Sequence, residues 1–595
     1  MTISTEEVLT SMKTKLIFDS SERLPFQNML FGLNAEITRK GFFGGLSAEM
    51  LNNRKLYAGE DAPSGWQCVN AERIADQPEK SLCGSRFVIL HDGEMTQSSG
   101  TISLRAGRTY EARIWVKAYG ETAEVTFGVE GFTESFSVSP DDRPYTALSF
   151  RFDGADLDNG TFVVKAKGTL AVFELSLLPT DHFYGMRRDV IACLKELSPT
   201  SVRFPGGCAA DHFAWKESLK APEFRVPSDG SSKWFLFRDS FDQDCMDIAL
   251  NEFILLCREL NAEPEFTVSL LLSDGEDAGH LVEYCNGGPE TEYGAKRQAL
   301  GLDAFGIRLW YIGNEAYFFG GPYRESGKAA ALRTNELTNS MRRADPSILT
   351  VLGLTWAEAY KPWNREFMRN IDCLWDFVSF HDYIGILPNP EQGHNGMATC
   401  GMLEDNLRDG ESIGLNFYKE DLFAGRFDGV EVCADEWNYS WGYDSSNALF
   451  FSNALQFHFL AKSYAKYHIV RAQFFMPVNE GMITVKGADC RIESSGELFR
   501  RMGRHRDGVL VGCRAENDDL DILCTEHEDG SLFLSVVNRV SDPCEIEPDG
   551  CEVLSCEEIH TGPYSFENNE FSVNENAGPV VHGHSVLFLT LKPEV

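Results

Sequence analysis

The 595-residue sequence is poor in positive charge. It contains 54 Lys and Arg against 90 Asp and Glu, which gives a formal net charge of −36. A surface field of that sign repels phosphate backbones and anionic lipid headgroups. We therefore expect neither a nucleic acid nor a membrane surface as partner, and the charge suits a protein that acts on a neutral substrate.

The sequence also lacks targeting and membrane-spanning patterns. Its first 26 residues contain no basic start followed by an apolar run, so we expect no secretory signal. The longest apolar stretch, 448–470, is interrupted by Lys462 and Lys466, which predicts a buried helix rather than a membrane span. We expect a cytoplasmic protein.

Cysteine and glycine motifs of metal and phosphate sites are missing as well. The 16 cysteines include no Cys-x-x-Cys pair, and no Cys/His group has zinc-ligand spacing, so we expect reduced thiols and no metal. Neither Gly-x-Gly-x-x-Gly nor Gly-x(4)-Gly-Lys-Ser/Thr occurs. The glycines of the stretch 203–207 (RFPGG) instead indicate a close backbone approach beneath a ligand.

What the sequence does contain is a repeating strand-and-helix pattern between about residues 31 and 477. Eight short β-branched or apolar runs occur, beginning at Phe31, Ser201, Pro264, Arg308, Ile348, Asp376, Val430 and Arg471. Amphipathic stretches such as 244–260 and 328–344 lie between them. Eight such units predict an α/β fold, a (β/α)8 TIM barrel with its active site at the C-terminal ends of the strands. A doubly wound open sheet is the alternative.

Two regions read as all-β. Alternating runs separated by turns between 65 and 179 predict a β-sandwich inserted in the first barrel loop, and residues 501–595 predict a C-terminal β-sandwich. Residues 1–30 would supply one or more strands to the C-terminal sandwich, notably through 13–19. The catalytic barrel would then comprise 31–64 and 180–500.

Acidic and polar residues follow three of the predicted barrel strands. The fourth run ends in Asn314-Glu315, the sixth in 381–383 (HDY) and the seventh in 435–438 (DEWN). The C-terminal ends of strands four and seven lie at the same end of a barrel, so Glu315 and Glu436 can face one another. Glycoside hydrolysis uses two carboxyl groups whose pKa values differ, so that one can donate a proton while the other is ionised. Each glutamate taken alone could instead be a surface ion pair or a helix cap.

Several ordered motifs make the chain recognisable. FGLNAEITRKGFFGGLSAEMLNNRKL from Phe31, SVRFPGGCAADHFAW from Ser201, VEYCNGG before RLWYIGNE, and VCADEWN follow one another along the chain. Over most of its length the sequence resembles glycoside hydrolase family 51, the α-L-arabinofuranosidases. The inserted module is similar to the carbohydrate-binding-like module of some members.

The resemblance implies a role for each matching residue. Glu315 would be the general acid/base and Glu436 the nucleophile, with their carboxyl groups roughly 5 Å apart, as a retaining mechanism requires. Asn314 would bind the sugar 2-hydroxyl. Tyr383 would orient the nucleophile, and His381 would support the same side of the sugar pocket.

Further residues would line the pocket by the same resemblance. Glu36 and Arg203 match positions that hold the furanose or the nucleophile. Apart from the resemblance, Trp437 and Trp441 follow the seventh strand, so one of them would also stack on a sugar face. Cys208 stands where many members have a sugar-binding Asn, and a thiol predicts a weaker contact. The sequence departs from the family pattern at two further places. Asp211 or His212 would fill part of the pocket, and Glu480, near the eighth strand, would bind a sugar hydroxyl or be solvated.

Together with the two glutamates, the resemblance implies a retaining exo-glycosidase that releases terminal α-L-arabinofuranose from oligosaccharides and needs no cofactor. By resemblance it would be a homo-oligomer, commonly a hexamer. One alternative is a related retaining glycosidase that acts on a β-xyloside, a β-glucan or another furanoside. The others are a non-catalytic carbohydrate-binding protein and a structural scaffold.

Overall fold

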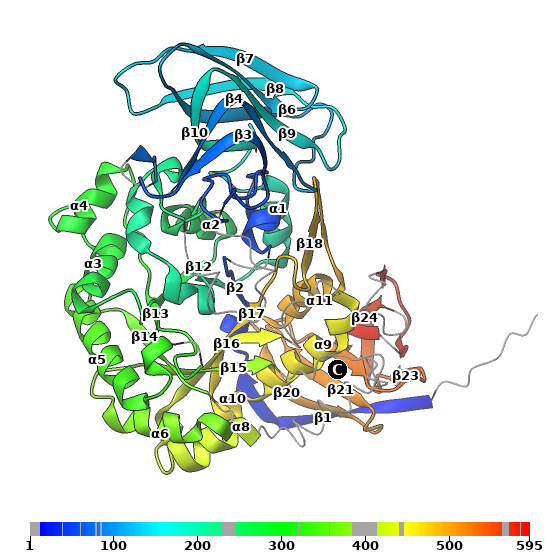
Figure 1. Ribbon diagram of the computed structural model, residues 1–595. Helices are drawn as coiled ribbons and strands as arrows, with labels where there is room; N and C mark the ends of the chain where they lie inside the picture. Colours follow the sequence, from blue (N-terminus) through cyan, green and yellow to red (C-terminus); the bar gives the residue numbers. More distant parts are fainter. Residues whose placement is uncertain are drawn as a thin grey trace, which may run out of the picture.

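Three sheets organise the molecule (Figure 1). The computed structural model describes residues 12–37, 40–59, 61–77, 80–83, 86–227, 246–318, 320–355, 358–383, 413–438, 446–561, 570–583 and 585–594. Of the residues considered from the sequence, Trp441 lies outside these ranges.

A closed barrel of eight parallel strands forms the centre. Its strands are, in order, β2 (Gly32–Asn34), β11 (Ser201–Phe204), β12 (Glu263–Val268), β13 (Leu309–Ile312), β14 (Leu349–Gly353), β15 (Phe377–Tyr383), β16 (Glu431–Asn438) and β17 (Ile469–Phe475). Strand β17 pairs in parallel with β2 and closes the ring. Every predicted run overlaps one of these strands, so the barrel prediction is confirmed and the open-sheet alternative is wrong.

Helices cover the outside of the barrel and bury their apolar faces on it in one continuous core. They are α1 (Arg188–Leu197), α2 (Leu250–Leu260), α3 (Gly275–Asn286), α4 (Glu292–Ala299), α5 (Gly327–Ala344), α6 (Lys361–Asn370), α8 (Ile413–Phe417), α9 (Ser446–Lys462), α10 (Tyr464–Tyr467) and α11 (Ser494–Met502). The apolar stretch 448–470 forms most of α9, then α10 and the start of β17. None of the described helices is long and apolar enough to cross a membrane.

The inserted region forms a second, antiparallel sheet above the barrel (Figure 1). It comprises β3 (Gln67–Ile74), β4 (Phe87–Ser98), β5 (Thr109–Ala118), β6 (Ala123–Val129), β7 (Phe132–Val138), β8 (Thr146–Asp153), β9 (Thr161–Lys167) and β10 (Thr169–Pro179). The strands pair in the order β7-β6-β9-β4-β10-β5-β8, with β3 also on β4, around a core of their own. The module is thus one curled sheet, whereas the sandwich that the sequence predicts has two separate sheets.

The third sheet joins the two ends of the chain. Strand β1 (Met12–Pro25) lies within it, and the other strands are β20 (Val509–Ala515), β21 (Leu520–Glu526), β22 (Leu532–Asn538), β23 (Cys544–Glu547), β24 (Cys551–His560), β25 (Ser572–Asn574), β26 (Val580–Val581) and β27 (Ser585–Pro593). Strand β1 pairs antiparallel with β20 on one side and parallel with β23 on the other. The N-terminal segment is therefore an interior strand of the C-terminal sheet.

A two-stranded hairpin follows the last barrel strand. It consists of β18 (Ile483–Lys486) and β19 (Asp489–Ile492) and rises from the barrel toward the inserted sheet (Figure 1). Arg105 of the inserted module forms an ion pair with Asp489 at 3.1 Å. The hairpin therefore connects the barrel with the inserted module.

Candidate active site

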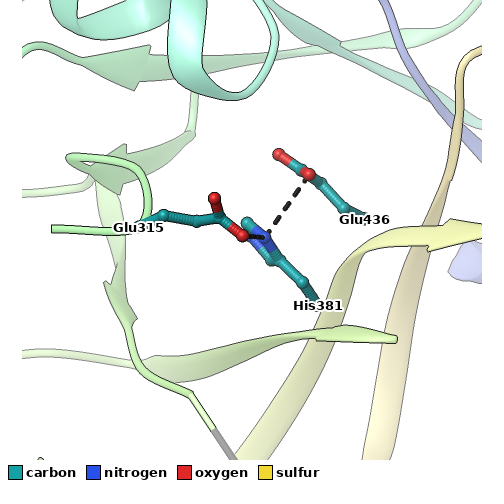
Figure 2. Close-up of side chains that lie close together, drawn as sticks. All are labelled: Glu315, His381 and Glu436. Carbon is teal, nitrogen blue, oxygen red and sulfur yellow. Dashed lines mark hydrogen bonds and ion pairs between the residues drawn. The ribbon is translucent and has the colours of Figure 1, made fainter. Parts of the chain in front are cut away.

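Glu315, His381 and Glu436 meet at the C-terminal ends of three barrel strands (Figure 2). Glu315 follows β13, His381 lies in β15 and Glu436 lies in β16. One oxygen of each glutamate and one ring nitrogen of the histidine all lie within 4.8 Å of one another. The ring nitrogen Nδ1 is 2.8 Å from Oε1 of Glu315 and 3.4 Å from Oε2 of Glu436. The imidazole thus lies between the two carboxylates.

The Glu436 carboxylate is held at both oxygens. Arg203 Nη1 donates to Oε1 at 3.0 Å, and the Tyr383 hydroxyl donates to Oε2 at 2.8 Å. Donors on both sides fix the rotation of the carboxylate and favour its ionised form. The residue is buried, so these contacts replace the water that would otherwise solvate the charge.

Arg203 connects three of the barrel strands. Its other terminal nitrogen donates to Asn314 Oδ1 at 2.8 Å and lies 3.3 Å from Oδ2 of Asp435. The guanidinium also stacks over the ring of Tyr311, 4.6 Å from its centroid. A fully buried cation needs such partners, because an unpaired charge in the interior is costly. Strand β11 therefore positions the residues that end β13 and β16.

Burial and neighbouring charges set the protonation of this cluster. Burial raises the pKa of Glu436 to about 7. The negative charges of Glu315 and Glu36 also raise this pKa, whereas the positive charges of His381 and Arg203 lower it. Burial opposes the charge on His381, but Glu436 and Asp435 keep its pKa well above the usual value. Burial likewise opposes ionisation of Asp435, whose pKa Arg203 and His381 nevertheless lower. At neutral pH His381 is protonated, while Glu436 titrates close to neutrality.

The backbone turns sharply where β13 ends. Gly313 has φ +77° and Glu315 has φ +41°, in the left-handed region that non-glycine residues seldom adopt. The hydroxyl of Tyr317 donates to Glu315 Oε1 at 3.3 Å, and the Cys208 thiol lies 3.8 Å from Oε2. These contacts direct Glu315 toward His381. Such strain at a single residue is typical of functional sites.

The glycines after β11 lie directly beneath the carboxylates. A Cβ atom on Gly207 would lie 2.3 Å from Oε1 of Glu436, and one on Gly206 would lie 2.3 Å from the Glu36 side chain. The Gly207 amide donates to Glu36 Oε2 at 3.1 Å. The structure therefore agrees with the close backbone approach that the RFPGG stretch predicts.

Seven of the residues predicted for the site come together here: Glu36, Arg203, Asn314, Glu315, His381, Tyr383 and Glu436. Cys208 joins them, because Asn314 Nδ2 donates to its sulfur at 3.8 Å. Both of these contacts of the thiol are long, as expected for a weak donor and acceptor.

Other predicted residues lie elsewhere. Trp437 is 2 % exposed, and its ring packs at 5.0 Å edge-to-face on Phe474 in the core, so it does not face the carboxylates. Glu480 is 2 % exposed, which contradicts the solvated alternative. Asp211 is buried and accepts from the Leu270 amide at 2.8 Å, while burial raises its pKa to about 7. It connects two loops at the barrel mouth rather than facing Glu315 and Glu436.

Sequence reasoning missed two contributors. Asp435 bridges Arg203 and His381, with its Oδ1 3.6 Å from His381 Nε2. Tyr317 supports Glu315 from two residues further along the chain. The sequence signal for both was their position, because Asp435 directly precedes Glu436 and Tyr317 lies two residues after Glu315.

The three groups of Figure 2 also have the spacing of metal ligands. A cation bound by these groups would have to break the contact between His381 Nδ1 and Glu315. It would also lie close to the positive guanidinium of Arg203, which is hydrogen-bonded to Glu436. The same geometry suits proton transfer and nucleophilic attack by two carboxylates, with the imidazolium balancing their charge.

Comparison with known proteins gives consistent matches. A family model described as the alpha-L-arabinofuranosidase 1 domain matches residues 193–383. An intracellular exo-alpha-(1->5)-L-arabinofuranosidase of Streptomyces lividans is 28 % identical over 288 residues, which cover 44 % of this chain and 41 % of that protein. Alpha-L-arabinofuranosidase 2 of Arabidopsis thaliana is 24 % identical over 350 residues, half of each chain. The matched region thus spans half or less of these relatives.

Solved structures extend the similarity to the whole fold. An arabinose-bound α-L-arabinofuranosidase, MgGH51, superposes with a TM-score of 0.73 at 16 % identity and covers 98 % of this chain and 100 % of its own. The Thermotoga maritima enzyme in complex with arabinose has a TM-score of 0.56 at 21 % identity, covering 68 % of this chain and 90 % of its own. The chain thus contains a region that matches the alpha-L-arabinofuranosidase 1 domain model, and it shares its fold with solved α-L-arabinofuranosidases of glycoside hydrolase family 51.

Proposed function

We propose that this protein is a retaining exo-glycosidase that releases terminal α-L-arabinofuranosyl residues from oligosaccharides. The observation that carries the proposal is the pair of glutamates after β13 and in β16, with one oxygen of each carboxylate within 4.8 Å of the other. Double displacement uses carboxyl groups about 5 Å apart, whereas inversion needs a gap of roughly 6.5–9.5 Å to admit a water molecule.

In this mechanism Glu436 attacks the anomeric carbon while Glu315 donates a proton to the leaving glycosidic oxygen. Arg203 and Tyr383 hold the attacking carboxylate in place through the two contacts described above. Glu315 then takes a proton from the water that hydrolyses the glycosyl–enzyme ester. His381 contacts both carboxylates, so its charge offsets the change of charge between them as the proton moves.

The sugar is inferred from the relatives. The matched relatives are named α-L-arabinofuranosidases, and two superposed structures contain arabinose. Asn314, which accepts a hydrogen bond from Arg203, would bind the 2-hydroxyl, a contact that strengthens in the transition state. Relatives from Streptomyces lividans and Bacillus subtilis are named intracellular, which supports a cytoplasmic location here. A homo-oligomer stays a prediction, which light scattering would check.

A panel of aryl glycosides tests the substrate. We expect turnover of 4-nitrophenyl α-L-arabinofuranoside and little turnover of the β-xyloside and β-glucoside. In methanol, NMR should show a methyl arabinofuranoside with the anomeric configuration of the substrate. Preferred turnover of another glycoside would favour the related-glycosidase alternative, and an inverted product would refute double displacement.

Variants of the two glutamates test the assignment. Glu436→Gln should lower kcat by about 10³-fold or more, since no nucleophile remains. Glu315→Ala should keep cleavage of an activated aryl leaving group, and azide should restore turnover by replacing the deprotonated water. Glu325→Gln, at an exposed glutamate on the loop after β13, is the matched control. Unchanged hydrolysis by the Glu436 variant would place the chemistry elsewhere.

A further inference from the structure

Two thiols from distant parts of the chain touch on the outside of the barrel. Cys193 lies in α1 and Cys490 in β19, 297 residues apart in sequence, and their sulfurs are 3.4 Å apart. Both side chains are partly exposed, and both cysteines are free. Contact between two accessible thiols is the arrangement from which a disulfide forms with little movement.

We propose that Cys193 and Cys490 form a redox-active pair that a two-electron oxidant closes into a disulfide, linking the β18–β19 hairpin to α1. A disulfide requires a sulfur–sulfur distance of about 2.05 Å and adjacent backbones. Helix α1 and strand β19 already pack against one another, so side-chain rotation can supply the remaining approach. The proposal is independent of the glycosidase assignment.

The two sulfurs have different roles in the reaction. The hydrogen bond from Cys490 lowers the pKa of Cys193, although burial acts in the opposite direction. The same contact, together with burial, raises the pKa of Cys490. Because the thiolate is the nucleophile, Cys193 is the attacking residue and Cys490 the resolving residue.

The chemistry balances with hydrogen peroxide as the oxidant. The Cys193 thiolate attacks one peroxide oxygen, the O–O bond breaks, and Cys193 becomes a sulfenic acid with release of water after protonation. The Cys490 sulfur then attacks the sulfenic sulfur, loses its proton and expels the hydroxyl group as a second water. Two thiols are oxidised, the peroxide is reduced, and a dithiol reductant reverses the change.

The hairpin that this bond would fix already connects parts of the molecule. Arg187, at the start of α1, donates to the carbonyl of Gly487 at 2.6 Å and to that of Ala488 at 3.0 Å. In the loop before the hairpin, Asn479 Nδ2 donates to the carbonyl of Lys40 at 2.7 Å. A covalent link here would close a loop of almost 300 residues, and long loops give the largest reduction in the entropy of the unfolded chain.

Peptide mapping after oxidation tests the proposal. The full-length protein is treated with a small excess of hydrogen peroxide, alkylated and digested. We expect one peptide that joins Cys193 to Cys490, a mass 2 Da lower than that of the reduced pair, and its loss after dithiothreitol.

Thermal unfolding gives a second measurement. The oxidised wild type should melt about 3 °C or more above the reduced form, and Cys193→Ser and Cys490→Ser should abolish this gain. Cys524→Ala, which removes a buried thiol of the C-terminal sheet, is the matched control and should keep it. Oxidation that leaves both thiols open to alkylation, or that yields only separate adducts on Cys193, would overturn the proposal.

Discussion

Arg203 is the residue around which the acidic side chains of the site are arranged. It contacts Glu436, Asp435 and Asn314 and is itself fully buried. Its charge works against the rise in the Glu436 pKa that burial causes. The position of the Glu436 carboxylate therefore depends on β11, a strand to which neither Glu315 nor Glu436 belongs.

The Tyr383 hydroxyl gives a prediction at this scale. Tyr383→Phe removes the hydrogen bond to Glu436 Oε2 and keeps the ring, whose centroid is 5.8 Å from that of Phe475. The lost bond favoured the ionised carboxylate, so the Glu436 pKa should rise further above about 7. Because attack requires the ionised form, the acid limb of the kcat/KM profile should move to higher pH.

Rates measured between pH 4.5 and 8.5 check this expectation. At pH 6 the variant should lose about 10–100-fold in kcat/KM, and part of the loss should be recovered as the pH rises. An acid limb at the wild-type position would show that the hydroxyl does not control the ionisation of Glu436.

Single residues also show the reach of sequence reasoning. Glu315 and Glu436 were found from their place at strand ends, because parallel strands open on one mouth. Trp437 does not take the predicted stacking role, since neighbouring residues of a strand face opposite sides and Glu436 already faces His381. The partners of Arg203 come from β13 and β16, two strands far from β11 in sequence, and no local pattern predicts such contacts.

At the scale of elements, β1 is the strand whose position depends most on distant sequence. It lies between β20 and β23, which follow it by about 500 residues. Leu16 and Thr14 on this strand are buried. Without β1, two strand edges with unpaired backbone groups would be open to other chains.

Deletion of residues 2–25 tests this role. We expect a protein that melts well below the full chain or aggregates on expression, because two edges and part of the sheet's core become exposed. Deletion of residues 2–11, which precede the strand, is the control. Circular dichroism melting and size-exclusion chromatography report the outcome, and an unchanged melting temperature after the longer deletion would refute the role.

The barrel strands could be predicted because their sequence signals are local. Each of the eight runs combines β-branched or apolar residues with a following turn, and these preferences act within a few residues. The curled form of the inserted sheet was not predicted, because pairing between strands depends on contacts that are distant in sequence.

At the scale of the whole molecule, a buried ionic cluster joins the inserted sheet to the barrel. Arg54 donates to Glu174 of β10 and, through Nε, to both oxygens of Asp247 at 3.0 Å. Glu49 lies beside it, with one carboxylate oxygen 3.8 Å from the same Nε. Three carboxylates around one guanidinium hold the two modules at a fixed position.

Arg54→Met should therefore destabilise the protein strongly. It leaves buried carboxylates without their cation, a loss of about 3–5 kcal/mol for such pairs. Arg151→Met, at an ion pair that is largely exposed, should cost less than about 1 kcal/mol. Urea unfolding measures both, and equal effects would mean that the buried cluster contributes no more than a surface pair.

By itself, the sequence determined the barrel, its eight strands and the two glutamates at the C-terminal ends of those strands. Strand propensity, turn residues and the direction of parallel strands are local properties, so they can be read along the chain. Only the tertiary structure decided that Asp435 bridges Arg203 and His381, that Trp437 packs in the core, and that Cys193 touches Cys490. Side-chain direction and strand register depend on closure of the whole barrel, which brings together residues hundreds of positions apart.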